Sequence, residues 1–513
     1  MIMNIVVIGA GAAGLTAAAK LAKSGHQVSV FDHNAKPGGV LMGWQKDGFR
    51  WDLGQLLLEG MGPGEPIGDV LTDLGIIEQI KTLKDDRRYV FPDFSITKPG
   101  TYAGQNWRMK VLKSIFPLDA DGLDRYWKDY MRFTKLMTIA RKIGKSSGIN
   151  GFWLKLRLLA ALFPFLSRQK WNANQLMESY FPSEKLRSVF TSILADFFTP
   201  PSQFLGLGVF ALNPEPSFDS RMEKYLPNQG EQIFHYSLPG GTTHLVDALV
   251  NCIEQHGGKI HLSSDVDGIQ IIDGKVSSVH LSSGETIPAN LVLASGGAKE
   301  TFLKLIGEEF LTHEFIQQVK DLPLMDSVFM VHLGLDFDPT PYTGGVCTYY
   351  YGTYDIEGGI IENQKHIYHQ GRLGFVTHAP SYRSDEMAPA GKNGFTIYTI
   401  CPNQLADGDW ESQKEFFADQ LIQYAEKHIP ELSRHILLRE IITPLDFCRI
   451  THTEKHAFGG LSPIMTKGGI PHKTPIQGLW FIGQQSDGGG GVGNVMAHAH
   501  QTAVKIDLDT RGM

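Results

Sequence analysis

Several features that would define a class of protein are missing from this chain of 513 residues. It has four cysteines, Cys252, Cys347, Cys401 and Cys448, and no CxxC pair, which excludes a disulfide framework or a zinc knuckle and favours a reducing compartment. No apolar run reaches the roughly 18 residues that a membrane-spanning helix needs. Basic residues are not in excess, because 47 Lys+Arg stand against 54 Asp+Glu, and nucleic acid is therefore not an expected partner.

The N-terminus is apolar, but it lacks the basic region and the small-residue cleavage site of a signal peptide. The composition, with 42% hydrophobic and 20% charged residues, suffices for large buried cores and excludes general disorder. We therefore expect a cytoplasmic α/β protein with several domain-sized parts.

A dinucleotide-binding pattern begins at the first residues. The apolar run 4–8 is typical of a buried parallel strand, and the glycine turn Gly9-Ala-Gly11-Ala-Ala-Gly14 leads from it into a helix over 15–23. A second strand over 26–31 ends at Asp32. In such a unit the glycines and the helix N-terminus hold a pyrophosphate, and the acid accepts hydrogen bonds from a ribose. No arginine stands beside Asp32, so the pattern predicts FAD or NAD rather than NADP.

Two further motifs follow in order, the pair Gly38-Gly39 and the F-x-x-D-x-G segment Phe49-Arg-Trp-Asp52-Leu-Gly54. Together with the glycine turn and Asp32 they resemble flavoprotein oxidoreductases related to the amine oxidases. The resemblance is strongest to the bacterial-type phytoene desaturases, carotenoid isomerases and retinol saturases, and it implies FAD as the cofactor. The chain departs from that family at Val40, where a basic residue is common.

A second glycine-rich turn lies near the C-terminus, between a strand over 478–483 and a helix over 495–505. In the resembled family this segment returns to the FAD and places the start of the helix beside the flavin ring. The resemblance therefore implies that the turn at Gly491 and Val492 contacts the isoalloxazine. The positive end of the helix dipole would there stabilise negative charge on a reduced flavin.

A third segment lies between these two. It contains a helix over 245–255, a strand over 259–262, a hairpin over 268–281 and a strand over 290–295. The resemblance implies that the backbone of Val266 meets the adenine, and it places the turn that starts with Ser295-Gly296 at another edge of the cofactor.

The predicted FAD-binding residues come from these three segments. They are Gly9, Gly11, Ala12, Ala13, Gly14, Asp32, Gly38, Gly39, Val40, Val266, Ser295, Gly296, Gly483, Gln484, Asp487, Gly491, Val492 and Asn494. Gln484 and Asn494 stand where the family commonly has an acid and a glycine.

The expected fold is therefore α/β, with a discontinuous Rossmann-like FAD-binding domain and an α+β substrate domain. The substrate domain would have an antiparallel sheet, with strands such as 327–335, 347–351 and 395–400, and a helical lid. The predicted ranges are 1–75, 235–300 and 440–513 for the FAD-binding domain, and 76–234 and 301–439 for the substrate domain.

No second GxGxxG with βαβ surroundings follows, so we expect no separate NAD(P)H domain and a quinone or oxygen as electron acceptor. The histidine pair His452 and His456 has HxxxH spacing but no third ligand nearby, so no metal site is expected. No catalytic acid or base can be assigned from the sequence.

The segment 125–170 has 11 basic residues and one acid, Asp129, and its stretch 152–166 is strongly apolar with aromatic residues at both ends. Basic residues interleaved with Trp, Phe and Leu favour peripheral binding to an anionic membrane surface, here on the inner face of a membrane. The alternative is a helical lid that packs on the rest of the protein and leaves its lysines solvated.

Under the family resemblance, the leading hypothesis is an FAD-dependent oxidoreductase that acts on a long apolar isoprenoid or polyene, carotenoid- or retinoid-like. Hydride would pass to or from flavin N5, with desaturation favoured over saturation or cis-trans isomerisation. The tyrosines 349–351 are typical of sheet packing, and under this hypothesis they would line an apolar tunnel. The rivals are an amine oxidase-like flavoenzyme for a small amine and a non-enzymatic prenyl-binding carrier of the GDP-dissociation-inhibitor type.

Overall fold

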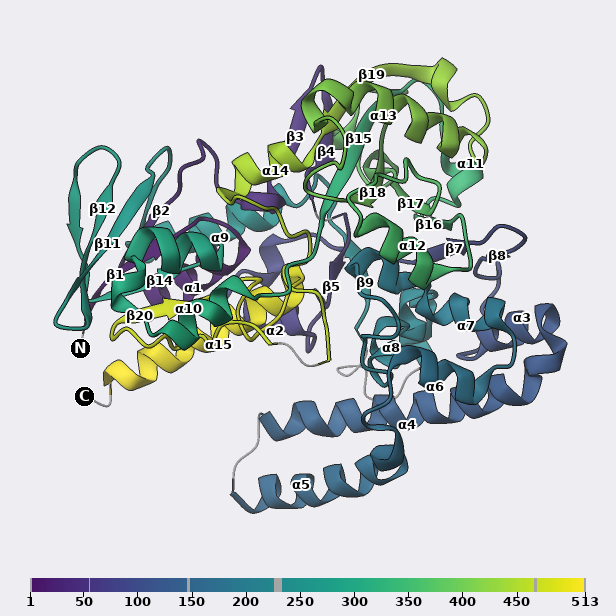
Figure 1. Cartoon of the computed structure of the whole chain (residues 1–513), viewed down its shortest axis with the longest axis horizontal. Helices are drawn as coiled ribbons and strands as arrows, with labels where there is room; N and C mark the ends of the chain where they lie inside the picture. Colours follow the sequence, from purple (N-terminus) through teal and green to yellow (C-terminus); the bar gives the residue numbers. More distant parts are fainter. Residues whose placement is uncertain (1, 55, 145–147, 226–232, 466–467, 512–513) are drawn as a thin grey trace.

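A five-stranded sheet in which all strands are parallel carries the N-terminal glycine turn, in the order β10-β2-β1-β14-β20 (Figure 1). The structure is a computed structural model that describes residues 2–54, 56–144, 148–225, 233–465 and 468–511. The strands are β1 (Asn4–Ile8), β2 (Gln27–Phe31), β10 (Lys259–His261), β14 (Leu291–Ala294) and β20 (Leu479–Phe481). The predicted strands, and with them the Rossmann-like fold, are confirmed to within one or two residues at each end.

Both faces of this sheet are buried, which explains the uninterrupted apolar runs of its strands. Ile5 and Val7 pack against one layer of helices, α1 (Ala12–Lys23), α9 (Thr243–Gln255) and α15 (Val492–Arg511). Val6 faces the opposite side, where an antiparallel sheet packs, built of β11 (Val266–Ile272), β12 (Lys275–Leu281) and β13 (Thr286–Pro288). The sequence predicted later starts for α1 and α15, because the first turn of each helix consists of small residues and valine within a glycine-rich stretch.

A seven-stranded sheet in the order β19-β15-β18-β17-β16-β7-β8 forms the second large layer. Its strands are β7 (Arg87–Val90), β8 (Ser95–Ile96), β15 (Ser327–Leu335), β16 (Cys347–Tyr351), β17 (Gly374–His378), β18 (Asn393–Cys401) and β19 (Ile436–Ile442). The predicted antiparallel strands are confirmed, and β7, which comes from a distant segment, joins the sheet parallel to β16.

The two faces of this sheet have different coverings. Phe329 and Val331 face α13 (Trp410–Glu426) and pack with Trp410. Met330 and Tyr349 belong to the opposite face, in the hydrophobic cluster that includes the helices of the lid. The lid helices are α3 (Trp107–Ile115), α4 (Ala120–Gly144), α5 (Gly148–Leu162), α6 (Ala173–Tyr180), α7 (Glu184–Thr191) and α8 (Gly208–Leu212).

The remaining elements are short and connect these layers. They are the hairpin β3 (Gly43–Lys46) and β4 (Phe49–Asp52), the small sheet β5 (Leu58–Glu59), β9 (His235–Ser237) and β6 (Leu83–Asp85), and the helices α2 (Pro66–Leu74), α10 (His313–Lys320), α11 (Thr340–Thr343), α12 (Ile356–Asn363) and α14 (Pro444–Thr451).

The stretch 302–315 packs on the parallel sheet, whereas the sequence assigned it to the substrate domain. Phe302 and Phe315 lie in the same hydrophobic cluster as Val6 and Phe481 of the parallel sheet, beyond the predicted boundary at residue 300. The rings of Phe302 and Phe481 are 5.2 Å apart. The packing thus attaches this stretch to the nucleotide-binding layers, and the exact domain limits stay a prediction.

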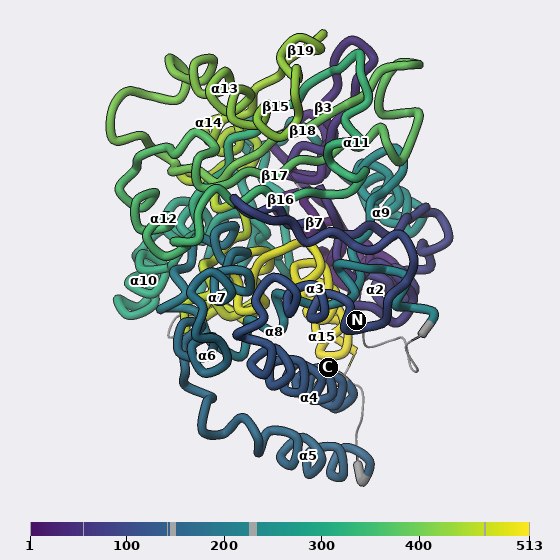
Figure 2. Tube along the Cα trace, turned by 90° about the vertical axis from the view of Figure 1, so that its right-hand side faces the viewer, coloured from purple at the N-terminus to yellow at the C-terminus, as the bar shows by residue number. Residues whose placement is uncertain are grey.

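The hairpin of α4 and α5 projects from the body, and α5 forms its outermost layer (Figures 1 and 2). Lys145 lies outside the described residues, as does the side chain of Arg141. Within the described part of the chain, none of the helices is both long and apolar enough to cross a bilayer.

A fully buried ion pair connects α3 to the segment 215–217 of the lid. The Arg108 guanidinium on α3 donates to both carboxylate oxygens of Glu215, with Nη2 to Oε1 at 2.7 Å and Nε to Oε2 at 3.2 Å. Neither side chain has any exposed surface. The guanidinium also lies 4.2 Å from the centre of the Phe218 ring.

We predict that Arg108→Met lowers the free energy of unfolding by about 3–5 kcal/mol, because it leaves the Glu215 carboxylate buried without a cation. Urea unfolding followed by circular dichroism measures this change. The control is Arg50→Met on the exposed side of β4, which should stay within about 0.5 kcal/mol of the parent. Equal stability of the two variants would show that the pair does not hold the lid.

Candidate functional site

A cavity of about 440 Å³ opens at the carboxyl end of the parallel sheet. Its lining comes from the ends of β1, β2, β14 and β20 and from the first residues of α1 and α15. The carboxyl edge is where open α/β sheets bind their ligands, since the strand ends and helix N-termini converge there.

Most of the predicted FAD-binding residues line this one cavity, although they come from three distant segments. The lining includes Gly9, Gly11, Ala12, Ala13, Asp32, Gly38, Gly39, Val40, Val266, Ser295, Gly296, Gly483, Gln484, Gly491 and Val492. Three predicted residues, Gly14, Asp487 and Asn494, are not part of that lining.

Each of these three has a contact inside the protein. Gly14 packs under the turn, where a Cβ would overlap the carbonyl oxygen of Gly9. The exposed Asp487 donates its backbone N–H to the Ile470 carbonyl, at 2.9 Å. The exposed Asn494 donates its side-chain amide to the Gly490 carbonyl, at 3.1 Å. Asp487 and Asn494 are thus outside the lining of the cavity, and their contact with FAD stays a prediction.

The glycine turn is fixed by contacts that leave no room for side chains. Gly9 adopts φ +96°, and its N–H donates to the Phe31 carbonyl at 2.8 Å. Ser295 Oγ donates to the Ile8 carbonyl at 2.9 Å and lies where a Cβ on Gly9 would be. Gly38 donates its N–H to the Ala10 carbonyl at 2.7 Å, which brings the glycine pair against the turn.

Gly11 is the position that indicates a ligand. It precedes α1 with φ −82°, a conformation open to any residue, and no described atom lies within 4 Å of a Cβ built there. The protein itself therefore has no need of glycine at this point, whereas a pyrophosphate that approaches the backbone does. The first N–H groups of α1 have no partner within the helix and face the same cavity, so the turn fits the diphosphate of FAD.

Asp32 is held in place at the end of β2. Its Oδ2 accepts a hydrogen bond from the N–H of Ala10 at 2.7 Å, and its Oδ1 accepts bonds from Asn34 N and Nδ2 at 2.8 and 3.0 Å. Asn34 also donates to the Ile450 carbonyl at 2.9 Å. A carboxylate has about four acceptor sites, so Asp32 retains capacity for ribose hydroxyls.

The C-terminal glycine run passes close to another loop before α15 begins. A Cβ on Gly490 would overlap the Gly459 carbonyl, whereas Gly491, with φ +83°, has open space around it. The amide Nε2 of Gln484 donates to the Ala457 carbonyl at 3.0 Å, so its side chain is used in holding this loop. Val492 and Val495 bring the start of α15 to the cavity.

Sequence reasoning missed one wall of the cavity, the end of α14 and the loop that follows it. Cys448 and Thr451 of α14 line it together with His452, and Glu300 and Lys304 contact the same loop at Glu454. The His452 ring lies 4.5 Å from that of His33, and its Nδ1 is 3.3 Å from Asp265 Oδ1. The HxxxH spacing was a signal, but His456 is buried elsewhere, with its Nδ1 2.7 Å from Ser327 Oγ.

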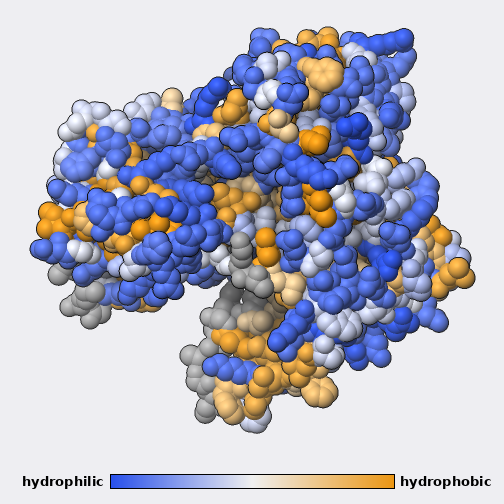
Figure 3. Space-filling model, viewed as in Figure 1, coloured by the Kyte–Doolittle hydropathy of each residue, from blue (hydrophilic) through white to orange (hydrophobic). Residues whose placement is uncertain are grey.

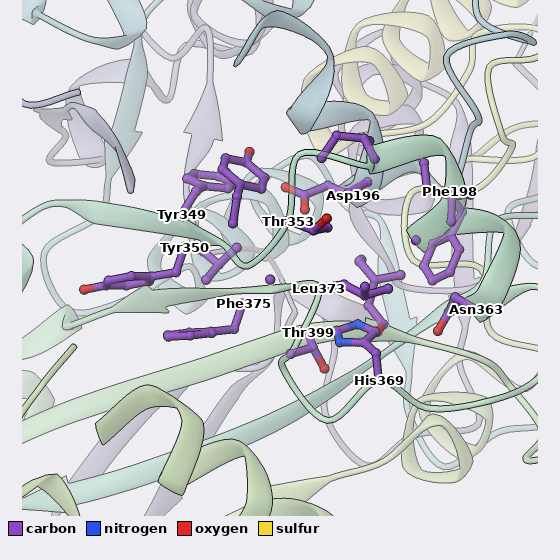
Figure 4. A pocket seen from close by; sticks show the side chains of 18 of the residues that line it. Asp196, Phe198, Tyr349, Tyr350, Thr353, Asn363, His369, Leu373, Phe375 and Thr399 are labelled. Atoms are coloured by element: carbon purple, nitrogen blue, oxygen red, sulfur yellow. The ribbon is translucent and has the colours of Figure 1, made fainter. Parts of the chain in front are cut away.

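A second, smaller cavity of about 50 Å³ lies beside the seven-stranded sheet, where α12 and the segment 195–198 pack near β16, β17 and β18 (Figure 4). The three tyrosines 349–351, Tyr398, Phe375 and Ile400 line it, and Asp196 is a charged group in its wall. The ring of Tyr398 is 5.9 Å from that of Phe458, which lines the larger cavity. These two rings therefore stand between the two cavities.

Comparisons with known proteins agree with this geometry. A family model of flavin containing amine oxidoreductases matches residues 12–335. A 4,4'-diapophytoene desaturase (4,4'-diapolycopene-forming) from Methylomonas sp is 26% identical over 471 residues, which cover 89% of this chain and 84% of the relative. Prolycopene isomerase 2, chloroplastic, from an Oncidium hybrid cultivar is 25% identical over 533 residues, covering 99% and 85%.

A solved structure gives the same fold. The crystal structure of an oxidoreductase from Methanosarcina mazei superposes with a TM-score of 0.60 at 18% sequence identity, covering 97% of this chain and 99% of that one. At this identity the likeness shows the fold alone.

Gly11 and Gly14, two of the three glycines of the turn, give opposite predictions for stability and FAD binding. Gly11→Ala should leave the free energy of unfolding of the apoprotein within about 0.5 kcal/mol of the parent, but weaken FAD binding at least about tenfold, since the methyl group meets only the ligand. Gly14→Ala should destabilise the apoprotein by about 1–3 kcal/mol, because its methyl group meets backbone. Urea unfolding and FAD titration measure both. A Gly11→Ala variant with unchanged FAD affinity would contradict a pyrophosphate at this turn.

Proposed function

The chain belongs to the flavin-containing amine oxidoreductase family and is an FAD-dependent oxidoreductase, and from this premise we propose that its substrate is a long apolar polyene. The observation that carries the proposal is the aromatic cavity beside the nucleotide cavity, separated from it by Tyr398 and Phe458. Its tyrosine and isoleucine side chains would contact one part of a conjugated hydrocarbon chain, because the cavity, at about 50 Å³, is smaller than the whole chain.

Desaturation is the reaction that we favour over saturation and isomerisation. Several relatives are named as phytoene or diapophytoene desaturases, and others as prolycopene isomerases. When bound, FAD supplies the hydride acceptor at its N5 atom. Asp32 would hold the ribose, and the turn around Gly11 would hold the diphosphate, both in the cavity that Phe458 also lines.

Neither rival fits the described residues as well. A non-enzymatic carrier has no use for a glycine at position 11, where the protein leaves open space for a ligand. A small polar amine would leave the apolar surface of α5 without a purpose. For reoxidation we propose a quinone or oxygen as electron acceptor, and a quinone would share the apolar route of the substrate.

We further propose that α5 binds an anionic membrane surface, from which the polyene is collected. Its exposed side chains include Trp153 and Leu159, which are 60% and 64% exposed, and Phe163, directly after its last residue, is 74% exposed. Figure 3 shows this projection as an apolar lobe below a mostly hydrophilic body. Lys155 and Arg157 are exposed on the same helix. Apolar side chains framed by cations are what an interfacial helix offers to anionic lipid.

Not all of the basic excess in 125–170 is available to lipid. Arg168 donates to Asp129 Oδ2 at 2.8 Å, and Arg132 to its Oδ1 at 3.0 Å. These two arginines share the one acid and fix the base of the hairpin, with Tyr180 donating to the same carboxylate at 2.6 Å. The cations toward the tip are the ones that we assign to the membrane.

The substrate is tested by anaerobic mixing of the holoenzyme with liposomes that carry phytoene, lycopene isomers or retinol. We expect the oxidised flavin absorbance to bleach with a C40 polyene in stoichiometric amount, because two hydrogens leave the substrate for each flavin reduced. Bleaching by putrescine or another small amine, with no response to any polyene, would overturn the proposal.

Membrane binding is tested by co-sedimentation with phosphatidylserine vesicles. The double variant Trp153→Glu/Phe163→Glu should bind at least about tenfold more weakly. It removes apolar area that the membrane would bury, and it adds negative charge that anionic lipid repels. Lys155→Glu/Arg157→Glu should lose a similar amount, at about 1 kcal/mol per cation near the surface, and only in vesicles with anionic lipid. Phe416→Glu, on the exposed side of α13 and 54% exposed in the parent, is the control and should bind normally. Sedimentation of the α5 variants at parental levels would refute this docking surface.

A further inference from the structure

Asp196 stands out among the acids of the chain by its surroundings. It lies in the 3-10 segment Ser192–Phe197 that follows α7, and it lines the aromatic cavity. Figure 4 shows its side chain between Tyr349 on one side and Phe198 on the other, near Thr353. An apolar environment disfavours the charge of a carboxyl group, so an aspartate in this aromatic wall indicates a role beyond packing.

No structural role accounts for the Asp196 side chain. Among the described residues, none donates a hydrogen bond to its carboxylate or forms an ion pair with it, whereas buried Asp32, Asp129 and Asp219 are each held by two or more donors. The Asp196 side chain is half-buried, so a solvent molecule or a ligand in the cavity can reach its carboxylate. An unsatisfied acid that faces a cavity is available to whatever enters the cavity.

Burial raises the pKa of Asp196 to about 7, and the Arg87 guanidinium acts in the opposite direction. Near neutral pH the group is therefore divided between acid and carboxylate, which is the state in which a general base or acid works best. The other groups that face it are neutral phenols and a thiol, Tyr89 on β7, Cys347, Tyr349 and Tyr351 on β16, and Tyr398 on β18. Burial raises the pKa of each of these phenols and of the thiol, so they stay neutral near pH 7. Asp196 and Arg87 are then the groups of this set that bear charge.

Arg87 is itself fixed and is not a competing partner. Its Nη2 donates to Glu59 Oε1 at 2.9 Å, and the same carboxylate oxygen lies 2.8 Å from His235 Nε2. The guanidinium carbon lies 5.8 Å from the centre of the Tyr349 ring. Arg87 thus sets the electrostatic potential at Asp196 from a distance and leaves the Asp196 carboxylate open.

We infer that Asp196 is a catalytic residue, the base that takes the proton released when the polyene is desaturated. This inference rests on the proposed function. In the step, one hydrogen leaves its carbon with both bonding electrons as hydride to the FAD. The hydrogen of the neighbouring carbon leaves as a proton to the Asp196 carboxylate, and the electrons of that C–H bond form the new double bond. The quinone or oxygen that reoxidises the flavin completes the balance.

The test is the pH dependence of single-turnover flavin bleaching by a C40 polyene. In the parent, the rate should rise with pH as Asp196 loses its proton, with a midpoint near 7, and level off above it. Asp196→Asn should lower the rate by about 100-fold or more and abolish that rise, since an amide takes up no proton. Asp196→Glu should restore part of both.

Asp409→Asn is the control, because Asp409 lies outside the lining of both cavities and an asparagine still caps α13, as the Asp409 carboxylate does through the Ser412 N–H at 2.8 Å. It should keep the parental rate and pH profile. A second readout needs no turnover: the infrared band of a protonated carboxyl should titrate near pH 7 in the parent and be missing in Asp196→Asn. If Asp196→Asn does not fold, Asp196→Glu decides the question: it should shift both the infrared titration and the pH profile of bleaching, and an unchanged profile would overturn the inference.

The outcomes separate this inference from the proposal on which it rests. If no polyene bleaches the parent, the proposed function fails, whatever Asp196 does. If polyenes bleach the parent and the folded Asp196→Asn variant bleaches at the same rate with the same pH profile, the role of Asp196 is wrong. If Asp196→Asn weakens only the response to amines, the carboxylate is an ammonium-binding group and the inference is overturned.

Discussion

The close contact between the end of β1 and the start of α1 is the constraint on which the rest of the site depends. Gly14 lies directly on the carbonyl of Gly9, and Ser295 closes the turn from β14. With no side chain between strand and helix, the helix N-terminus points at the carboxyl edge of the sheet. The open space beside Gly11 lies in this turn, and the Ala10 N–H of the same turn holds Asp32 at 2.7 Å.

Burial of the parallel sheet on both faces explains why the site is assembled from distant segments. Each strand is only three to five residues long and is stable only between its neighbours. The order β10-β2-β1-β14-β20 therefore brings Asp32, Ser295 and Gly483 to one edge, although some 450 residues separate the first from the last. The second sheet sets its lid-facing aromatic side against this edge, where Tyr398 meets Phe458.

The sequence predicted well those parts of the site that are defined by local backbone geometry. The glycine turns and the acid after β2 have fixed spacings within one βαβ unit, so their positions could be read from a short segment. It predicted poorly the parts that depend on packing between segments. His452 reaches the cavity through contacts with His33 and Asp265, and Asp196 through the meeting of the lid and the sheet, and neither has a local pattern. Asp487 lies in the expected turn and Asn494 in the first turn of α15, but neither is part of the cavity lining, which spacing alone does not determine.

The central claim is that one FAD binds with its diphosphate at the first glycine turn and its ribose at Asp32. Calorimetric titration of the apoprotein with FAD, in the absence and presence of ADP, tests it most directly. The account predicts one FAD for each chain and competitive displacement by ADP, which occupies the same turn and the same carboxylate. Failure of the folded apoprotein to bind FAD, or FAD binding that ADP leaves unaffected, would contradict it.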